Sequence, residues 1–372
     1  SRAVTTPNND TLYSSCWVDL SAGPVRLQVA QMPAGRYWSV ALMDFFTNHF
    51  ALPGSRLDGR GPVQATLVGP RWAGPLPAGR VIRAPGDDAW LLGRWLVDGP
   101  HDLAAARAMQ DALTLDAPAL PAAAPRPVPA KVADPATFLA VVNHALGRNP
   151  PPSADDALLR RYAAVGVRAG VPDAWAQLSP ALQQAWAARI GPSLASLRDG
   201  LMSHGRRVQG WRLPNEAVGD FGSQHALRAA VALGGLAALP PMEAVYLMRD
   251  IDDTGAPLDG TRRYRVRIPP GGVPCDAFWS LTMYQREADG RLFFVDNPIG
   301  RYAVGDRTPG IVRSADGSMD LWLQPQAPTD PAARANWLPS AAGPVAVSLR
   351  AYLPRLDLRQ GRAALPTVER LA

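Results

Sequence analysis

The sequence predicts a mainly β protein with α-helical parts, built as two jelly-roll or β-sandwich-like domains joined by a helical segment. The 38 prolines and 33 glycines among 372 residues favour short strands and turns over long helices. Both ends of the chain alternate short apolar runs with Gly/Pro turns, whereas the middle carries helix caps. A chain of this length is also long enough for two cores.

The first β-domain is expected over residues 1–100. Pro7 and the Asn8-Asn-Asp10 run predict a turn before the first strand. Asn and Asp favour turns because their side chains hydrogen-bond to the backbone nearby. Later turns at Gly23-Pro24 and Pro33-Ala-Gly35 separate further apolar runs. The predicted strands are 11–20, 25–29, 37–43, 63–68, 81–84 and 90–97.

A helical segment with a Pro/Ala-rich linker is expected over residues 101–240. The linker covers residues 118–129. Asp134 followed by Pro135 is a cap residue followed by a first-turn proline, which predicts a helix start. The last helix of the segment is expected over residues 221–239.

The second β-domain is expected over residues 241–372. Asp252-Asp-Thr-Gly255 is typical of a hairpin turn between two apolar runs. The predicted strands are 245–249, 264–268, 278–284, 319–323 and 345–353. Strand parity places Phe278, Ser280, Thr282 and Tyr284 on one face and Trp279 on the other, in the core.

One pattern occurs in both β-regions. Tyr37-Trp-Ser39 and Phe278-Trp-Ser280 each follow a Pro/Gly turn and each open an alternating strand. We interpret the pair as two related β-domains.

Several stretches resemble a family known by two domain labels, DUF1254 at the N-terminal end and DUF1214 at the C-terminal end. The resemblance lies in Thr6-Pro-Asn-Asn-Asp-Thr-Leu-Tyr-Ser14, Phe278-Trp-Ser-Leu-Thr-Met-Tyr284, Asn297-Pro-Ile-Gly-Arg-Tyr302 and Asn336-Trp-Leu-Pro339. It implies two jelly-roll-like domains and little about chemistry. Gln224-His225 departs from the family, which usually has an acidic-aromatic pair there.

Composition narrows the range of partners. The net charge of +6 comes from scattered arginines and a single lysine, Lys131, so nucleic-acid binding is not expected. The longest apolar run, residues 229–239, is too short to span a bilayer. No signal peptide is visible, and the sequence leaves the compartment open between periplasm, secretion and cytoplasm.

The motifs of common enzymes are missing. We find no nucleotide-binding glycine pattern and no G-x-S-x-G, so no cofactor is predicted. The five histidines lack ligand spacing, so no metal ligand is assigned, although a calcium site of Asp and Asn oxygens stays open. Carboxylates, tyrosines, asparagines and arginines remain. The predicted catalytic residues are Asp10, Tyr302 and Asp306; the predicted substrate-binding residues are Asn8, Asn9, Tyr13, Tyr284, Asn297, Arg301 and Arg307.

Two interpretations of Arg301 and Arg307 stay open. They clamp an anionic substrate, or they are largely buried and brace their loop by pairing with Asp296 and Asp306; we favour bracing.

Two functions also stay open. The first is a hydrolase-like enzyme that acts on a small-molecule or glycan substrate where the 8–13 and 297–307 motifs meet between the domains. The alternative is a non-catalytic carbohydrate-binding or assembly protein of jelly-roll type, with a homo-oligomer as its assembled form.

Overall fold

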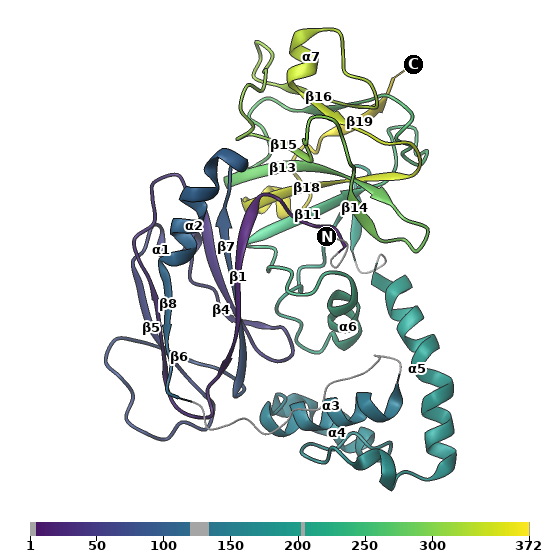
Figure 1. The fold of residues 1–372 in the computed structure, drawn as a ribbon. Helices are drawn as coiled ribbons and strands as arrows, with labels where there is room; N and C mark the ends of the chain where they lie inside the picture. Colours follow the sequence, from purple (N-terminus) through teal and green to yellow (C-terminus); the bar gives the residue numbers. More distant parts are fainter. Residues whose placement is uncertain (1–4, 120–133, 202–204, 372) are drawn as a thin grey trace.

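The computed structural model describes residues 5–119, 134–201 and 205–371. It confirms a mainly β fold with two β-rich domains and a helical segment, and none of its sheets closes into a barrel. Figure 1 shows the first β-sandwich in purple and blue, the second in green and yellow, and the helical segment beside both.

The strands are β1 (Thr11–Asp19), β2 (Val25–Val29), β3 (Trp38–Met43), β4 (His49–Ala51), β5 (Val63–Val68), β6 (Arg80–Arg83), β7 (Asp88–Leu96), β8 (Leu113–Asp116), β9 (Arg206–Val208), β10 (Trp211–Leu213), β11 (Ala244–Arg249), β12 (Tyr264–Ile268), β13 (Cys275–Arg286), β14 (Leu292–Phe294), β15 (Ala303–Gly305), β16 (Met319–Gln324), β17 (Trp337–Pro339), β18 (Val345–Pro354) and β19 (Thr367–Arg370). The α-helices are α1 (Ser55–Asp58), α2 (Leu103–Asp111), α3 (Pro135–Arg148), α4 (Asp156–Ala163), α5 (Pro180–Leu201), α6 (His225–Gly234), α7 (Pro331–Ala335) and α8 (Leu356–Arg359).

The first sandwich packs sheet β1-β7-β3-β4 against sheet β6-β5-β2-β8. Alternate residues of each strand enter one core, in which Trp38 and Trp95 stack 6.2 Å apart. Strand β8 pairs with β2, so the N-terminal sheet continues past the predicted boundary at residue 100 to about residue 116. Helix α2 connects β7 to β8 along the chain and packs on β1 and β7.

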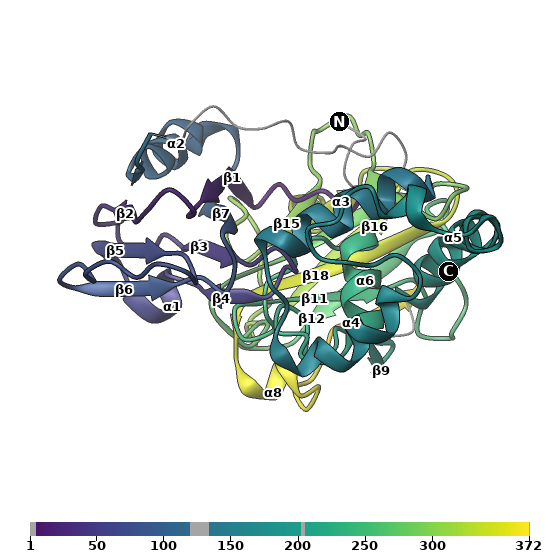
Figure 2. The ribbon, with the colours of Figure 1, turned by 90° about the horizontal axis from the view of Figure 1, so that it is seen from below.

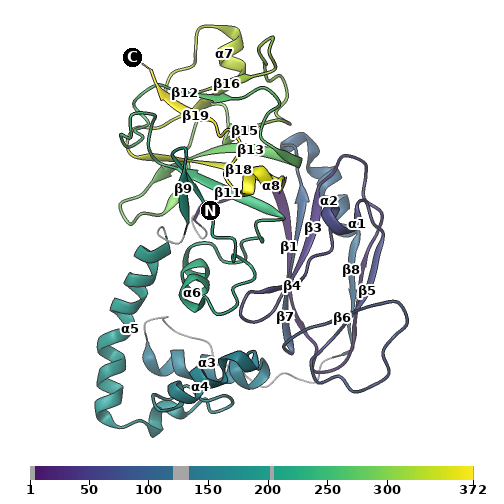
Figure 3. The same cartoon turned by 180° about the vertical axis from the view of Figure 1, so that it is seen from behind.

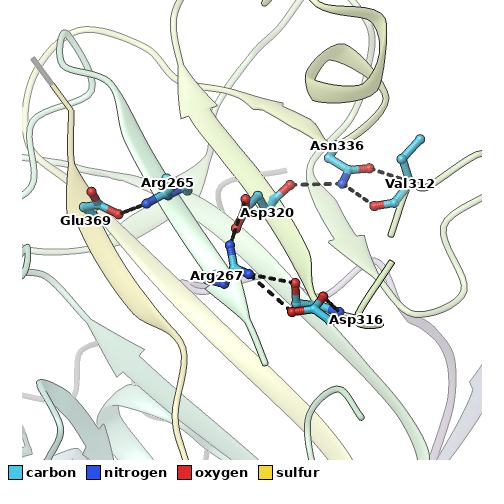
Figure 4. A network of polar contacts seen from close by, with 8 residues as sticks. Arg265, Arg267, Val312, Asp316, Asp320, Asn336 and Glu369 are labelled. Carbon is cyan, nitrogen blue, oxygen red and sulfur yellow. Dashed lines mark hydrogen bonds and ion pairs between the residues drawn. The ribbon is translucent and has the colours of Figure 1, made fainter. Parts of the chain in front are cut away.

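The second sandwich packs the sheet that contains β13, β18 and β11 against sheet β17-β16-β12-β19. The solvent face of the second sheet carries charged pairs, among them Arg265 with Glu369 and Arg267 with Asp320 (Figure 4). The nearby Asn336, between α7 and β17, is buried, and its side chain bonds backbone groups (Figure 4). The charged side chains of this face are therefore paired with one another.

In the helical segment between the sandwiches, helix α3 begins where the sequence predicts a helix start. Asp134 caps α3 by accepting a hydrogen bond from the Thr137 backbone N–H, with Pro135 in the first turn. Residues 120–129 of the predicted linker lie outside the described residues. Figure 2 shows α3, α4, α5 and α6 grouped on one side of the second sandwich. Helix α6 ends at Gly234, so the predicted last helix is shorter than residues 221–239.

The two sandwiches meet through the outer faces of two sheets. Apolar side chains of the first sheet, such as Leu92 and Leu96 on β7, pack in one cluster with Phe278 and Tyr352 of the second. The Phe278 and Tyr352 rings stack 4.2 Å apart, and Tyr37 of the first sandwich lies 5.8 Å from Phe278. Figure 3 shows the end of the first sheet against this part of the second sandwich. We call this surface the domain boundary.

We predict that Phe278→Ala lowers the free energy of unfolding by about 3–5 kcal/mol, because the substitution leaves a cavity where a buried ring joins both sandwiches. The check is urea unfolding followed by tryptophan fluorescence. Leu57→Ala, at a side chain that is 55% exposed, is the control and should change stability by less than about 0.5 kcal/mol. Equal losses in the two variants would show that the boundary contributes nothing.

Candidate functional site

The segment before β1 belongs to the first domain in sequence but lies on the second. The Thr6 backbone N–H donates to the Leu292 carbonyl oxygen at 2.7 Å, and the Tyr284 hydroxyl donates to the Pro7 carbonyl oxygen at 2.6 Å. Residues 5–10 therefore cross the outer face of the sheet formed by β13 and β18 before β1 begins (Figure 1).

Asp10 is the acid at the centre of this crossing. Its side chain is buried, and its Oδ2 accepts a hydrogen bond from the Ser280 hydroxyl at 2.7 Å. Arg350, on the neighbouring strand β18, has its Nη1 3.7 Å from the same oxygen. Burial raises the pKa of Asp10 by more than Arg350 and Ser280 lower it. The proton affinity of this carboxyl is thus shifted towards neutral pH.

Arg350 is held by several acceptors besides Asp10. Its Nη1 donates to the Thr282 hydroxyl at 2.6 Å, and its Nη2 donates to the Pro7 carbonyl oxygen at 3.0 Å and to the Tyr284 hydroxyl. These acceptors belong to β13 and to the crossing segment, so the buried guanidinium joins the two domains.

Three tyrosines connect this acid–arginine pair to a second buried arginine, Arg94. Tyr13 stands opposite Arg94 in the β1–β7 register, and its ring centroid is 5.4 Å from the Arg94 Cζ. Tyr246 and Tyr352 lie in the second sandwich, close enough to Arg350 to interact with its charge. Burial raises the pKa of both hydroxyls. Their hydroxyls therefore stay protonated and can donate hydrogen bonds.

Asn8 ties these hydroxyls together. Its Nδ2 donates to the Tyr352 hydroxyl at 2.9 Å and lies 3.2 Å from the Tyr13 hydroxyl. The Tyr13 side chain is 42% exposed, so the cluster reaches the protein surface there. We call Asp10, Arg350, Arg94, Tyr13, Tyr246, Tyr352 and Asn8 the boundary cluster.

A second buried acid lies beside the cluster. Glu243 accepts hydrogen bonds from the Tyr37 hydroxyl at 2.8 Å and from Arg56 Nε at 2.7 Å. Burial raises the pKa of Glu243, and burial next to this carboxylate raises that of Tyr37. Burial and the nearby Arg94 lower the pKa of His49 to about 3, so His49 is neutral near pH 7.

The predicted site residues divide into two groups. Asn8, Asp10 and Tyr13 meet Tyr284 at the boundary, whereas Asn9 is exposed beside them. The 297–307 loop does not line the boundary cluster through its predicted residues: Asn297 bonds the carbonyl oxygens of Val295 and Arg301 within its own loop.

Arg301 and Tyr302 have structural contacts. Arg301 Nη1 donates to the carbonyl oxygens of Ala335 and Trp337, so the predicted pairing with a carboxylate is wrong for this residue. Both bonds come from one nitrogen of the guanidinium and go to the backbone rather than to a carboxylate. The Tyr302 ring packs 4.9 Å from Phe294.

Asp306 and Arg307 hold the edge of the boundary. Asp306 accepts a hydrogen bond from the Trp279 backbone N–H at 3.1 Å. Arg307 does pair with a carboxylate, but with Asp98 of the first sandwich, through Nε at 2.7 Å and Nη2 at 2.5 Å. Its side chain is 35% exposed, so the expectation of a largely buried arginine is also wrong.

Sequence reasoning missed the two arginines of the cluster and most of its tyrosines. Arg94 and Arg350 each stand in an otherwise apolar strand, at a position whose neighbours in sequence enter the core. A single arginine in an otherwise apolar strand is the sequence pattern that would have indicated them, because charged side chains are rarely buried without a partner.

Within the described ranges, no three His, Cys, Asp or Glu side chains gather closely enough to hold a metal ion. None of the helices in those ranges has both the length and the apolar character needed to cross a membrane.

Comparison with known proteins now identifies the family. A model described as protein of unknown function (DUF1254) matches residues 1–117, and one described as protein of unknown function (DUF1214) matches residues 243–356. The chain belongs to the DUF1254/DUF1214 family. All seven residues of the boundary cluster therefore lie in the two family regions: Asn8, Asp10, Tyr13 and Arg94 in the first, and Tyr246, Arg350 and Tyr352 in the second.

Two solved structures resemble this family member. The crystal structure of the VPA0106 protein from Vibrio parahaemolyticus has 26% sequence identity and a TM-score of 0.77, over 99% of this chain and 90% of that one. A putative uncharacterized protein from Burkholderia cenocepacia has 14% identity and a TM-score of 0.49, over 99% and 78%. Among curated proteins nothing matches.

We predict that Arg307→Met lowers the free energy of unfolding by about 1 kcal/mol, because it removes a two-point ion pair between the sandwiches. Thermal and urea unfolding check this. Arg355→Met is the matched control, since Arg355 pairs with Asp276 inside one sandwich and both side chains are 62% exposed. The control should change stability less; an equal or larger loss would contradict the bridging role of Arg307.

Proposed function

We propose that the protein is an enzyme that performs acid–base chemistry on a small polar substrate at the domain boundary, with Asp10 as the acid or base. The observation that carries the proposal is a buried carboxyl that hydrogen-bonds across two domains, lies among tyrosine hydroxyls and has a raised pKa. Ligand sites favour domain interfaces, and catalytic acids favour pKa values shifted towards the working pH.

The neighbours of Asp10 support a positioning role. Ser280 donates to one carboxyl oxygen, which fixes the plane of the acid. Arg350 contributes a positive charge that is itself held by Thr282 and a backbone carbonyl. A group held in this way needs little reorganisation when a substrate's charge develops beside it. The hydrolytic reaction and the glycan substrate expected from the sequence remain hypotheses within this proposal.

A second candidate, carbohydrate binding without catalysis, is favoured by a different observation. Trp17 on β1 is 58% exposed and stacks on Trp90 with a centroid distance of 5.7 Å. Phe45 lies 5.8 Å from the same Trp17 ring. Exposed flat rings provide an apolar surface against which a sugar ring can lie, and Trp17→Ala should then abolish glycan retention while Asp10→Asn leaves it unchanged.

We predict that the wild-type protein turns over at least one member of a panel of p-nitrophenyl esters and glycosides. Asp10→Asn should reduce that rate by about 10²–10⁴-fold, the usual contribution of a general acid or base. Asp276→Asn, at a surface aspartate whose side chain is 62% exposed, is the control and should keep the wild-type rate. Equal rates for Asp10→Asn and wild type would refute the assignment of Asp10.

The raised pKa of Asp10 gives a second prediction, on stability. Its folded-state pKa lies above the ordinary value of 3.8, so its stabilising contribution is present below pH 3.8 and is lost as the pH rises through the folded pKa. Asparagine cannot ionise. The free energy of unfolding of Asp10→Asn minus that of wild type should therefore increase from about pH 4 upwards and then level off above the folded pKa.

Urea unfolding at a series of pH values checks this difference, in which the other titrating groups cancel. A difference that falls with rising pH would mean that the Arg350 ion pair, rather than burial, sets the protonation of Asp10.

A further inference from the structure

We infer that Arg94 anchors a carboxylate monoanion, so that the substrate or ligand of the domain boundary is a small carboxylic acid. This inference rests on the proposed function for the location of the site and adds the chemical class of its ligand. Arg94 lies on β7 in the first sandwich and reaches the same tyrosines that surround Asp10.

Arg94 lacks hydrogen bonds that a buried guanidinium normally makes. Arg94 is 4% exposed, and its Nη2 donates a hydrogen bond to the Ala237 carbonyl oxygen at 2.7 Å. Nε and Nη1 have no hydrogen-bond partner in the part of the chain that the structure describes. Buried donors are normally paired, and leaving them unpaired costs about 1–3 kcal/mol, more for a charged group.

Another buried arginine shows what a structural role looks like. Arg249 is also 4% exposed, but its Nε, Nη1 and Nη2 donate to the carbonyl oxygens of Ile251, Gln209 and Asp252. The backbone thus satisfies Arg249 on all three nitrogens, and Arg94 on one. An acceptor supplied by a ligand would complete the hydrogen bonding of Arg94 Nε and Nη1.

Charge determines which acceptor fits. Each buried acid at the boundary has an arginine partner: Asp10 pairs with Arg350, and Glu243 pairs with Arg56. When both of these carboxyls are ionised, Arg94 remains as one surplus positive charge, and His49 beside it is neutral. A singly charged carboxylate balances this charge, whereas a phosphate dianion would bury an unmatched negative charge.

The surroundings suit a carboxylate that enters from the surface. The Tyr13 ring covers the guanidinium at 5.4 Å and is itself 42% exposed, so displacement of this side chain opens Arg94 to solvent. Tyr246 and Tyr352 feel the charges of both Arg94 and Arg350. These two rings therefore lie near both arginines of the boundary cluster.

The test uses propionate as the probe and propionamide as its neutral analogue of the same shape. Thermal unfolding of the wild-type protein is measured against each at constant ionic strength. Propionate should raise the melting temperature and propionamide should not. Arg94→Met should weaken the apparent propionate affinity by about tenfold or more, the equivalent of losing a charge-assisted hydrogen bond. Arg249→Met, matched in burial and charge, should keep the wild-type response.

Three outcomes overturn the inference: no response to propionate, an equal response to propionamide, or an undiminished response in Arg94→Met. A stronger response to inorganic phosphate would overturn the assignment to a monoanion. If Arg94→Met does not fold, a crystal of the wild-type protein soaked in propionate decides: a carboxylate on Nε or Nη1 supports the inference, and water alone on these atoms overturns it. None of these readouts requires turnover, so the inference can fail while Asp10 catalysis holds, and the reverse.

Discussion

The contact of Asp10 with Ser280 and Arg350 is the interaction on which the rest of the boundary depends. It joins the segment before β1 to the outer face of the second sandwich, and it requires that segment to cross from one domain to the other. Burying a carboxyl there disfavours its charge, and one arginine only partly compensates. The protein therefore keeps a proton-binding group at the place where its two domains meet.

Strand parity explains why polar groups gather at this surface. In each sandwich the strand with the aromatic-Trp-Ser pattern directs the tryptophan, Trp38 or Trp279, into its own core. The flanking Ser39 or Ser280 then points to the opposite face, towards the other domain. The aromatic residues of the two copies, Tyr37 and Phe278, meet there at 5.8 Å. That the two domains are related remains a prediction, but the repeated pattern has the same geometric result in both.

The sequence predicted the fold more fully than the site. Period-two alternation located most of the strands, and it also placed Trp279 in the core with Ser280 and Tyr284 on the opposite face. Asn8, Asn9 and Asp10 were selected because three consecutive amide and acid side chains form a dense hydrogen-bonding patch. Strand patterns are local, so they can be read from neighbouring residues.

The rest of the site depends on contacts that local patterns do not encode. Arg301 and Asn297 resemble ligand-binding residues, yet both donate hydrogen bonds to backbone carbonyl oxygens. Arg94 and Arg350 resemble isolated charges in apolar strands, and only the packing of the two sheets brings them to the same tyrosines. Whether a polar side chain serves a ligand or the backbone is decided by tertiary structure.

The most direct test of the account is the pKa of the Asp10 carboxyl in the folded protein, measured by ¹³C NMR of aspartate-labelled protein, with Asp10→Asn to assign the resonance. We predict titration above the ordinary value of 3.8, because burial outweighs the attraction of Arg350. Titration below 3.8 would show that Asp10 and Arg350 form a structural ion pair, and would contradict an acid–base role for the domain boundary.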